Sequence, residues 1–307
     1  MNRLQGAGQE KKLSDAPDAN RKNEQAHAVG LRWLTALIAM PVVLLLVWFG
    51  GWVAFAGALF VVALGTFELH QMMRHAGYRP LTWVSLGLSI LFLVAAMLPS
   101  QRTLLFETLL GAALLVPFPL LFLRERLDGA LVDWSLTLII AAYLGWPMSV
   151  FLMLRGYQAA IIRPAGGGWL WLPAGAWWLL VVFLGVWGFD GAAFFVGRRF
   201  GRHRLAPRIS PAKSWEGVIG GLALSVVASL LFTVVPLGVP WYLAVVLGLL
   251  VGAAAVLGDL AESLIKRQTN VKDSGQFMPG HGGMLDRVDS LLFAVIVVAA
   301  FAHLIGR

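Results

Sequence analysis

The sequence predicts an all-α, polytopic integral membrane protein with about nine transmembrane helices, and two observations lead to this fold class. Of its 307 residues, 59% are hydrophobic and only 13% are charged, whereas a soluble domain has about 25% charged residues. Long apolar runs recur along the chain, each near the roughly 20 residues that a helix needs to cross a bilayer. Because too few polar side chains remain to cover a soluble surface, an ordinary soluble protein is excluded.

Apolar runs locate the expected helices. They cover residues 32–50, 52–69, 81–98, 104–122, 130–154, 177–197, 216–236, 241–260 and 289–305. The run 130–154 fits least well, because it contains Asp133, Gly145 and Pro147. Residues 1–29 are mostly polar, which predicts a disordered tail. We divide the remainder into N-terminal transmembrane helices (30–176) and a C-terminal transmembrane region (177–307) that we expect to carry the functional site.

Charge predicts the orientation in the membrane. With the N-terminus inside, every Lys and Arg except Arg102, Arg155, Arg163 and Arg307 falls on the cytoplasmic side, as the positive-inside rule requires. We therefore expect a multi-pass protein of the cell inner (cytoplasmic) membrane, with a cytoplasmic tail. The net charge of +8 then reflects orientation and contact with anionic lipid rather than nucleic acid. The absence of Cys excludes disulfides, thiolate catalysis and Cys-ligated metals.

Seven of the 16 acidic residues lie between positions 190 and 289, and most of these seven fall in or next to apolar runs. Asp190 falls inside the run 177–197, Asp259 and Glu262 close the run 241–260, and Asp286 and Asp289 open the last run. A spacing of three places both carboxylates of each pair on one helical face. Because a carboxylate in hydrocarbon is costly without a partner, a cavity or a metal, these acids are functional candidates. We expect the two pairs to meet near the cytoplasmic surface.

The two pairs have the chemistry of a metal site. Helix capping is the alternative for Asp286 and Asp289, since acids stabilise a helix N-terminus. Capping does not explain Asp259 and Glu262, which lie at a C-terminal end where the helix dipole disfavours acids. Clustered carboxylates without Cys are oxygen ligands for a hard cation, and Mg²⁺ is the natural choice.

Two basic loops are expected to face the same side. Residues 266–283 combine Lys and Arg with several glycines, whose backbone can approach an anion closely, although no Walker sequence is present. Residues 197–217 also carry Lys and Arg that could hold a phosphate. For either loop the alternative is a solvated connection beside anionic lipid. Ser210 or Ser214 together with Glu216 is also typical of a helix N-cap.

These segments resemble a known family. Residues 263–267 (SLIKR), 272–275 (KDSG) and 279–289 (PGHGGMLDRVD) reproduce the signature of the phosphatidate cytidylyltransferases. Residues 258–262 and the block from Asp190 to Gly217 are also similar to that family. The resemblance is close over about residues 186–290. Family members often have Lys and Thr where this chain has Ala212 and Ser214, which puts a substrate contact at position 212 in doubt.

The resemblance implies a nucleotidyltransferase of phospholipid biosynthesis. It would transfer CMP from CTP to phosphatidate, giving CDP-diacylglycerol and pyrophosphate, with metal bound by Asp259, Asp286 and Asp289. We expect one or two Mg²⁺ ions there, bridging nucleophile and triphosphate oxygens. The expected partners are CTP, phosphatidate and the bilayer, with no nucleic acid and with a homodimer left open. The catalytic candidates are Asp259, Asp286, Asp289, Lys266, Arg267, Lys272 and Asp273, and the substrate-binding candidates are Ser210, Lys213, Glu216, Asp190, His281 and Arg287.

Three other functions share some of these features. A secondary transporter would place its polar residues near the midplane in repeated halves, but here they crowd into one third of the chain. A CDP-alcohol phosphotransferase motif begins with Asp-Gly, as at Asp190, but requires Ala-Arg where this chain has Phe194 and Phe195. A CTP-dependent lipid kinase stays open. Outside the signature, we place Glu68 in the cytoplasmic interface and give Asp133 a polar packing role.

Overall fold

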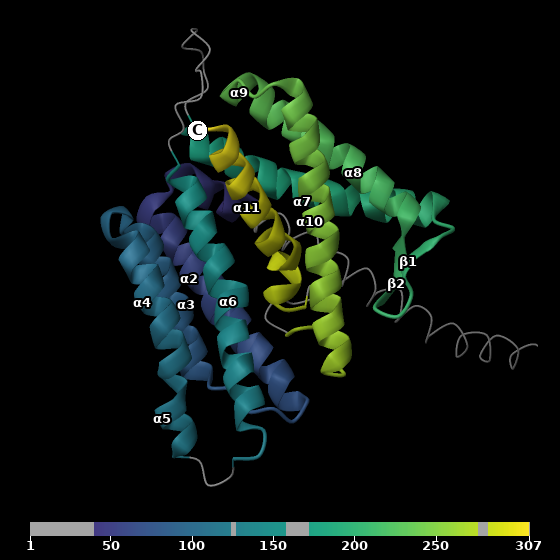
Figure 1. Ribbon diagram of the computed structural model, residues 1–307. Coiled ribbons are helices and arrows are strands. Elements are labelled where there is room, and N and C mark those ends of the chain that lie inside the picture. The colour runs from purple at the N-terminus through teal and green to yellow at the C-terminus, as the bar shows by residue number, and fades with distance from the viewer. Residues whose placement is uncertain (1–39, 124–126, 158–171, 276–281, 307) are drawn as a thin grey trace, which may run out of the picture.

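Helices dominate the computed structural model, which describes residues 40–123, 127–157, 172–275 and 282–306 (Figure 1). The predicted tail, 1–29, lies outside these residues. In chain order the helices are α2 (Gly51–His75), α3 (Thr82–Met97), α4 (Arg102–Leu115), α5 (Pro117–Phe122), α6 (Ala130–Arg155), α7 (Ala174–Phe200), α8 (Trp215–Ser229), α9 (Val235–Leu237), α10 (Trp241–Gln268) and α11 (Leu285–Ile305). A short apolar helix, Met40–Phe49, precedes them. A 3₁₀ turn (Pro99–Gln101) joins α3 to α4, and a π-helical segment (Leu230–Val234) joins α8 to α9.

Seven stretches of the described chain are long and apolar enough to cross a membrane. They are Gly51–His75, Pro99–Phe122, Ala130–Arg155, Ala174–Phe200, Trp215–Leu237, Trp241–Gln268 and Leu285–Ile305. Each coincides with one of the nine predicted runs. The other two runs correspond to the shorter helices Met40–Phe49 and Thr82–Met97; residues 32–39 of the first run lie outside the described residues. The multi-pass, all-α class is confirmed.

Helix α6 is the most buried of these spans, although its sequence fitted the prediction least well. Its unusual residues serve packing. Asp133 is buried and accepts a hydrogen bond of 2.6 Å from the backbone N–H of Arg79. Gly145 lies against α3 so closely that a Cβ atom there would be 2.7 Å from the Cα atom of Ser89. The polar packing role predicted for Asp133 is confirmed, and α6 forms the centre of the N-terminal helices.

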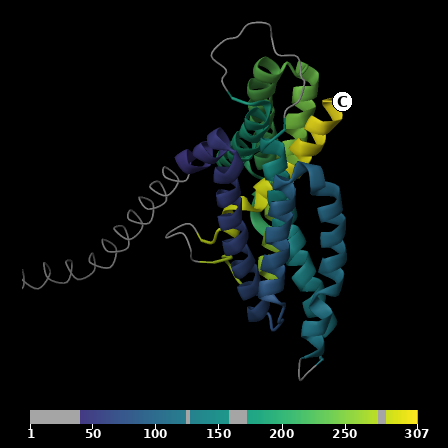
Figure 2. The same ribbon diagram turned by 90° about the vertical axis from the view of Figure 1, so that its left-hand side faces the viewer.

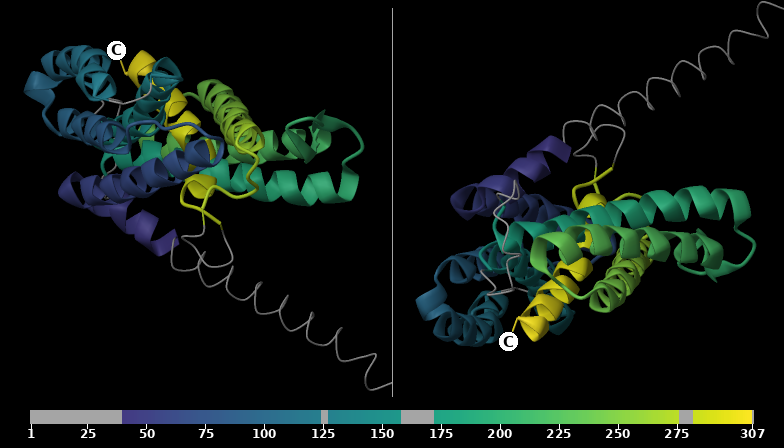
Figure 3. Two further views of the ribbon diagram at one scale, coloured as in Figure 1. Left: turned by 90° about the horizontal axis from the view of Figure 1, so that it is seen from below. Right: turned by 90° about the horizontal axis from the view of Figure 1, so that it is seen from above.

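Helices α7 and α8 form an arm that ends in a hairpin. Strand β1 (Arg204–Ala206) pairs antiparallel with β2 (Ser210–Ser214). Seen from below, the arm extends away from α2, α3 and α6, and α11 lies between the two groups (Figure 3). Ser214 ends β2 and begins α8, because its Oγ accepts a 3.2 Å hydrogen bond from Gly217 N. This confirms the N-cap prediction for Ser214.

A glycine sets the separation of α10 and α11. A Cβ atom on Gly258 would lie 2.6 Å from the carbonyl oxygen of Asp289 and 2.7 Å from the Cα atom of Ser290. The hydroxyl of Ser290 donates to the carbonyl of Ala255 at 3.1 Å, across the same contact. The next residue in α10 is Asp259. Close helix packing at Gly258 therefore brings the acids of α10 beside those of α11.

Candidate active site

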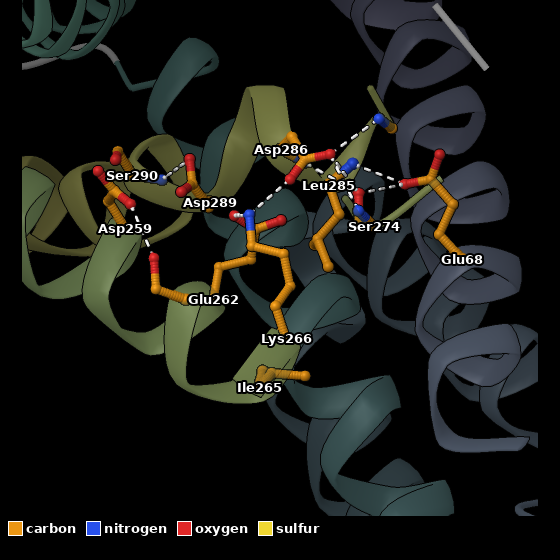
Figure 4. A network of polar contacts seen from close by, with 12 residues as sticks. Glu68, Asp259, Glu262, Ile265, Lys266, Ser274, Leu285, Asp286, Asp289 and Ser290 are labelled. Carbon is orange, nitrogen blue, oxygen red and sulfur yellow. Dashed lines mark hydrogen bonds and ion pairs between the residues drawn. The ribbon is translucent and has the colours of Figure 1, made fainter. Parts of the chain in front are cut away.

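Eight charged side chains from four elements gather where α10 meets α11. They are Asp190 of α7, Lys213 of β2, Asp259, Glu262 and Lys266 of α10, and Asp286, Arg287 and Asp289 of α11. Figure 4 shows the part of this cluster between the two helices. The predicted meeting of the two acidic pairs is thus confirmed. The cluster also includes Glu262, which the sequence placed among the candidate acids but which was not among the metal ligands that the family resemblance implied.

Lys266 joins the two helices. Its Nζ lies 2.8 Å from Glu262 Oε2, one turn earlier in α10, and 2.7 Å from Asp286 Oδ1 in α11. The Glu262 side chain is only 2% exposed and that of Asp286 is 10% exposed. Buried charges of opposite sign interact more strongly than they would in water. Lys266 therefore holds two carboxylates at fixed positions.

Asp286 is held from the other side by the loop before α11. Its Oδ2 accepts hydrogen bonds from Ser274 N at 3.1 Å, from Ser274 Oγ at 2.9 Å and from Gly283 N at 2.8 Å. Both oxygens of this carboxylate are thus engaged (Figure 4). The signature residues around Ser274 and Gly283 fold into a cradle for the Asp286 side chain.

A second ion pair ties the hairpin to α10. Lys213 pairs with Asp259, whose Oδ1 also accepts a 3.3 Å hydrogen bond from Ser263 Oγ. Asp190 is exposed in the middle of α7 and lies within electrostatic reach of Asp259, Lys213 and Asp289. The arm, α10 and α11 therefore share one charged cluster.

The surroundings of the Glu262 carboxylate suit a bound cation. Its residue is 1% exposed, and its Oε1 has no hydrogen-bond partner among the described residues. Asp289, which is also buried, lies within electrostatic reach of it. An uncompensated carboxylate oxygen in such a place is costly. A cation beside Glu262 and Asp289 would satisfy it.

The predicted metal ligands do not form a closed cage. In the part of the chain that the structure describes, no group of three His, Asp or Glu side chains is arranged to hold a metal ion. Asp259 and Asp286 each pair with a lysine instead. Mg²⁺ typically takes one or two protein carboxylates and completes its shell with water and substrate phosphates. The donor set therefore fits Mg²⁺ on the condition that water and a phosphate-bearing substrate would supply the remaining oxygens.

Two predicted substrate-binding residues in and next to the hairpin, Ser210 and Glu216, differ in their surroundings. Arg267 Nε donates to the carbonyl of Ile209 at 3.2 Å, which places Ser210 beside the end of α10. The carboxylate of Glu216 accepts from the backbone N–H groups of Arg202 and His203 and lies 2.6 Å from His203 Nδ1. Glu216 thereby holds the turn before β1, and its predicted substrate contact stays a prediction.

The loop residues frame the site. Lys272 and Asp273 are exposed in the segment after α10, next to Ser274. Arg287 is exposed in the first turn of α11 and lies within electrostatic reach of Asp190. His281 falls outside the described residues.

Sequence reasoning missed a partner of the site from the N-terminal helices. Glu68 was expected in the cytoplasmic interface, but it is buried in α2 and its carboxylate accepts hydrogen bonds from Met284 N and Leu285 N, both at 2.8 Å. Its placement at the cytoplasmic interface of the membrane stays a prediction, and its contact with α11 is what the sequence did not indicate. In Figure 2 the yellow-green segment that follows α10 runs beside the dark-blue α2, and His75 Nδ1 lies 3.0 Å from the carbonyl oxygen of Thr269 there. The sequence feature that could have indicated this contact is the presence of an acidic residue, Glu68, in the apolar run 52–69.

Comparison with known proteins shows the family of this chain. Residues 30–305 match the family described as the cytidylyltransferase family. A phosphatidate cytidylyltransferase of Pseudomonas aeruginosa is 37% identical over 292 residues, which cover 90% of this chain and 97% of that protein. The proteins of the same name from Synechocystis sp. and Bacillus subtilis are 34% and 30% identical, over 89% and 86% of this chain and 96% and 94% of theirs. The match spans the whole charged cluster and nearly all of the membrane helices, and the chain therefore belongs to the cytidylyltransferase family.

Proposed function

We propose that the cluster between α10, α11 and β2 is the catalytic site of a membrane phosphatidate cytidylyltransferase. The chain transfers CMP from CTP to phosphatidate, giving CDP-diacylglycerol and pyrophosphate for phospholipid synthesis, as the family and the names of its relatives support. The observation that supports this proposal most is that Lys266 pairs with buried acids where α10 contacts α11. Such a site concentrates fixed charges where phosphates must meet.

The reaction needs alignment more than proton transfer. A phosphate oxygen of phosphatidate attacks the α-phosphorus of CTP, and a new P–O–P linkage forms as the bond to the β-phosphate oxygen breaks. The nucleophile is already an anion, so a strong general base is unnecessary. The site must neutralise charge and hold the two substrates in line. Fixed cations on α10 and the hairpin supply that alignment.

We assign Mg²⁺ as the cofactor, held by Asp259, Asp286 and Asp289 with help from Glu262. When bound, the ion would neutralise charge on the phosphate oxygens of both substrates. Support comes from the unpartnered Oε1 of Glu262 and from the acids that converge on it. Carboxylate oxygens are the ligands that this hard cation prefers.

The basic residues then face the phosphates. Lys213 and Lys266 balance carboxylates in the protein alone, and a bound cation would leave their ammonium groups to bind phosphate oxygens. Arg267, Lys272 and Arg287 are exposed around the same site and would screen the triphosphate. Arginine does so through a bidentate fork and lysine as a point charge.

The proposed membrane arrangement follows from charge. Nine spans, a cytoplasmic N-terminus and an inner-membrane location would place the basic loops and the site on the cytoplasmic side, where CTP is available. The structure supports this in one respect, because the hairpin and the end of α2 each contact the end of α10. A homodimer is compatible with this arrangement.

The test is an assay of purified protein in detergent with phosphatidate, CTP and Mg²⁺, followed by mass spectrometry. We expect CDP-diacylglycerol and pyrophosphate. The Asp286→Asn variant should fold but lose more than about 100-fold in rate, because the proposed Mg²⁺ would lose a charged carboxylate ligand. Asp128→Asn, in an exposed turn, is the matched control. Release of CDP with a phosphorylated lipid would indicate a kinase instead, and full activity of Asp286→Asn would overturn the assigned site.

A further inference from the structure

Glu68 of α2 lies at the N-terminus of α11, although more than 200 residues separate them in the chain. Its Oε1 accepts from Met284 N and its Oε2 from Leu285 N, both at 2.8 Å. Figure 4 shows the side chain reaching from α2 toward these groups. The residue is only 7% exposed, so its carboxylate is committed to α11 and the loop before it.

This contact replaces an ordinary helix cap. The first N–H groups of a helix lack partners within the helix, and a Ser, Thr, Asp or Asn at the N-cap usually accepts from them. In α11 the N-cap residue is Met284, whose side chain accepts no such bond. Glu68 satisfies two of these N–H groups from another helix, and its negative charge is favourable at the positive end of the α11 dipole.

The same carboxylate also contacts the loop that holds Asp286. Ser274 Oγ lies 3.3 Å from Glu68 Oε2 and 2.9 Å from Asp286 Oδ2. Ser274 is 3% exposed and sits between the two acids. Glu68 therefore touches both structures that orient Asp286, namely the start of α11 and Ser274.

Two glycines of the signature leave room for this arrangement. A Cβ atom on Gly275 would lie 2.5 Å from Glu68 Oε1, and one on Gly283 would lie 2.6 Å from Glu68 Oε2. Real Cβ atoms essentially never come this close to another atom. Both glycines therefore leave space in which the Glu68 carboxylate lies.

We propose that Glu68 is a positioning residue for cytidylyl transfer, which holds Asp286 in register with Lys266 by fixing the start of α11 and Ser274. The proposal rests on the catalytic role proposed for Asp286. Partners of this kind that orient a metal ligand contribute about 10- to 100-fold in metal affinity or activity.

The experiment compares Glu68→Gln with Glu107→Gln in the full-length enzyme. Glu107 is exposed on α4 and undergoes the same chemical change. Glu68→Gln keeps the shape of the side chain but replaces one acceptor oxygen with a donor. We measure kcat, the KM for CTP and the Mg²⁺ concentration for half-maximal rate, per folded molecule counted by gel filtration in detergent. Ser274→Ala, alone and combined with Glu68→Gln, tests the path through Ser274.

A positioning role predicts a kcat lower by about 10- to 100-fold in Glu68→Gln, or a Mg²⁺ requirement raised by that factor. The double variant should lose less than the product of the two single losses, because both act through Asp286. A kcat and a Mg²⁺ requirement within twofold of Glu107→Gln would overturn the proposal. If Glu68→Gln fails to fold, Ser274→Ala decides alone by the same criteria. Loss in Asp286→Asn without loss in these variants would overturn this inference and leave the catalytic site standing.

Discussion

The ammonium group of Lys266 lies 2.7 Å from Asp286 Oδ1, and this ion pair joins the last turns of α10 to the first turn of α11. The ion pair connects the signature segment 263–267 with the signature segment 279–289. Lys266 also pairs with Glu262, so one cation balances two carboxylates that water reaches poorly. Loss of Lys266 would therefore leave both carboxylates without the cation that they share.

Replacing Lys266 by Met should destabilise the protein by about 3–5 kcal/mol, because two buried carboxylates would lose their cation. The midpoint of thermal unfolding in detergent measures this change. Lys272→Met, at an exposed loop position, should change stability by less than about 0.5 kcal/mol. The double variant Glu262→Gln/Lys266→Met should recover part of the loss. Equal midpoints for the two single variants would show that Lys266 carries no such role.

Adding one methyl group at Gly258 should separate α10 from α11. The new Cβ atom would meet the backbone of Asp289 and Ser290, and backbone cannot move aside as a flexible side chain can. We expect Gly258→Ala to reduce kcat at least about tenfold and to lower stability by about 1–3 kcal/mol. Gly111→Ala in α4, where a Cβ atom meets nothing within 4 Å, should be neutral or slightly stabilising. Indistinguishable behaviour of the two variants contradicts the close-packing argument.

Removal of divalent metal should abolish turnover, and Mg²⁺ should restore it. In Asp259→Asn the Mg²⁺ concentration for half-maximal rate should rise by at least about tenfold, since a charged oxygen ligand is lost. Titration of Mg²⁺ into EDTA-treated enzyme measures this value. Asp128→Asn serves as the control. An unchanged Mg²⁺ requirement in Asp259→Asn would remove that residue from the proposed ligand set.

Ser214→Ala should cost about 1 kcal/mol, because α8 loses the side chain that accepts from Gly217 N. Ser135→Ala is the matched control, since Ser135 only donates to the carbonyl of Leu131 within its own helix. The comparison uses unfolding midpoints in the same detergent. Because Lys213 precedes Ser214 on β2, we also expect a raised KM for CTP or phosphatidate. Equal stability of the two variants would show that the cap contributes nothing.

Local patterns predicted the helices and most of the members of the charged cluster. Apolar runs of sufficient length marked seven stretches that the structure shows as candidate spans, because a helix that crosses a membrane must satisfy its backbone within itself. The spacing of three between acids marked the faces that meet at α10 and α11. The apparent weakness of the run 130–154 was misleading, since Asp133 and Gly145 serve contacts with neighbouring helices.

Long-range contacts could not be predicted in the same way. Nothing near Glu68 in the chain indicates that its acceptor oxygens meet backbone N–H groups of α11. Similarly, the spacing of Ser214 and Glu216 suggested a shared N-cap, but Glu216 turns to His203. Such partners depend on how helices pack in three dimensions, which periodicity within one helix does not record.

The contact between Glu68 and α11 also means that its two partners are synthesised at different times. Glu68 precedes Leu285, from whose N–H it accepts, by 217 residues. At about 5–20 residues per second, roughly 10 to 40 s of translation separate the two. During that interval the inserted α2 carries a carboxylate whose hydrogen-bond donors have not yet left the ribosome. Assembly is complete only when α11 emerges, and a nascent chain stalled before that point keeps Glu68 without the two backbone donors that it has in the folded protein.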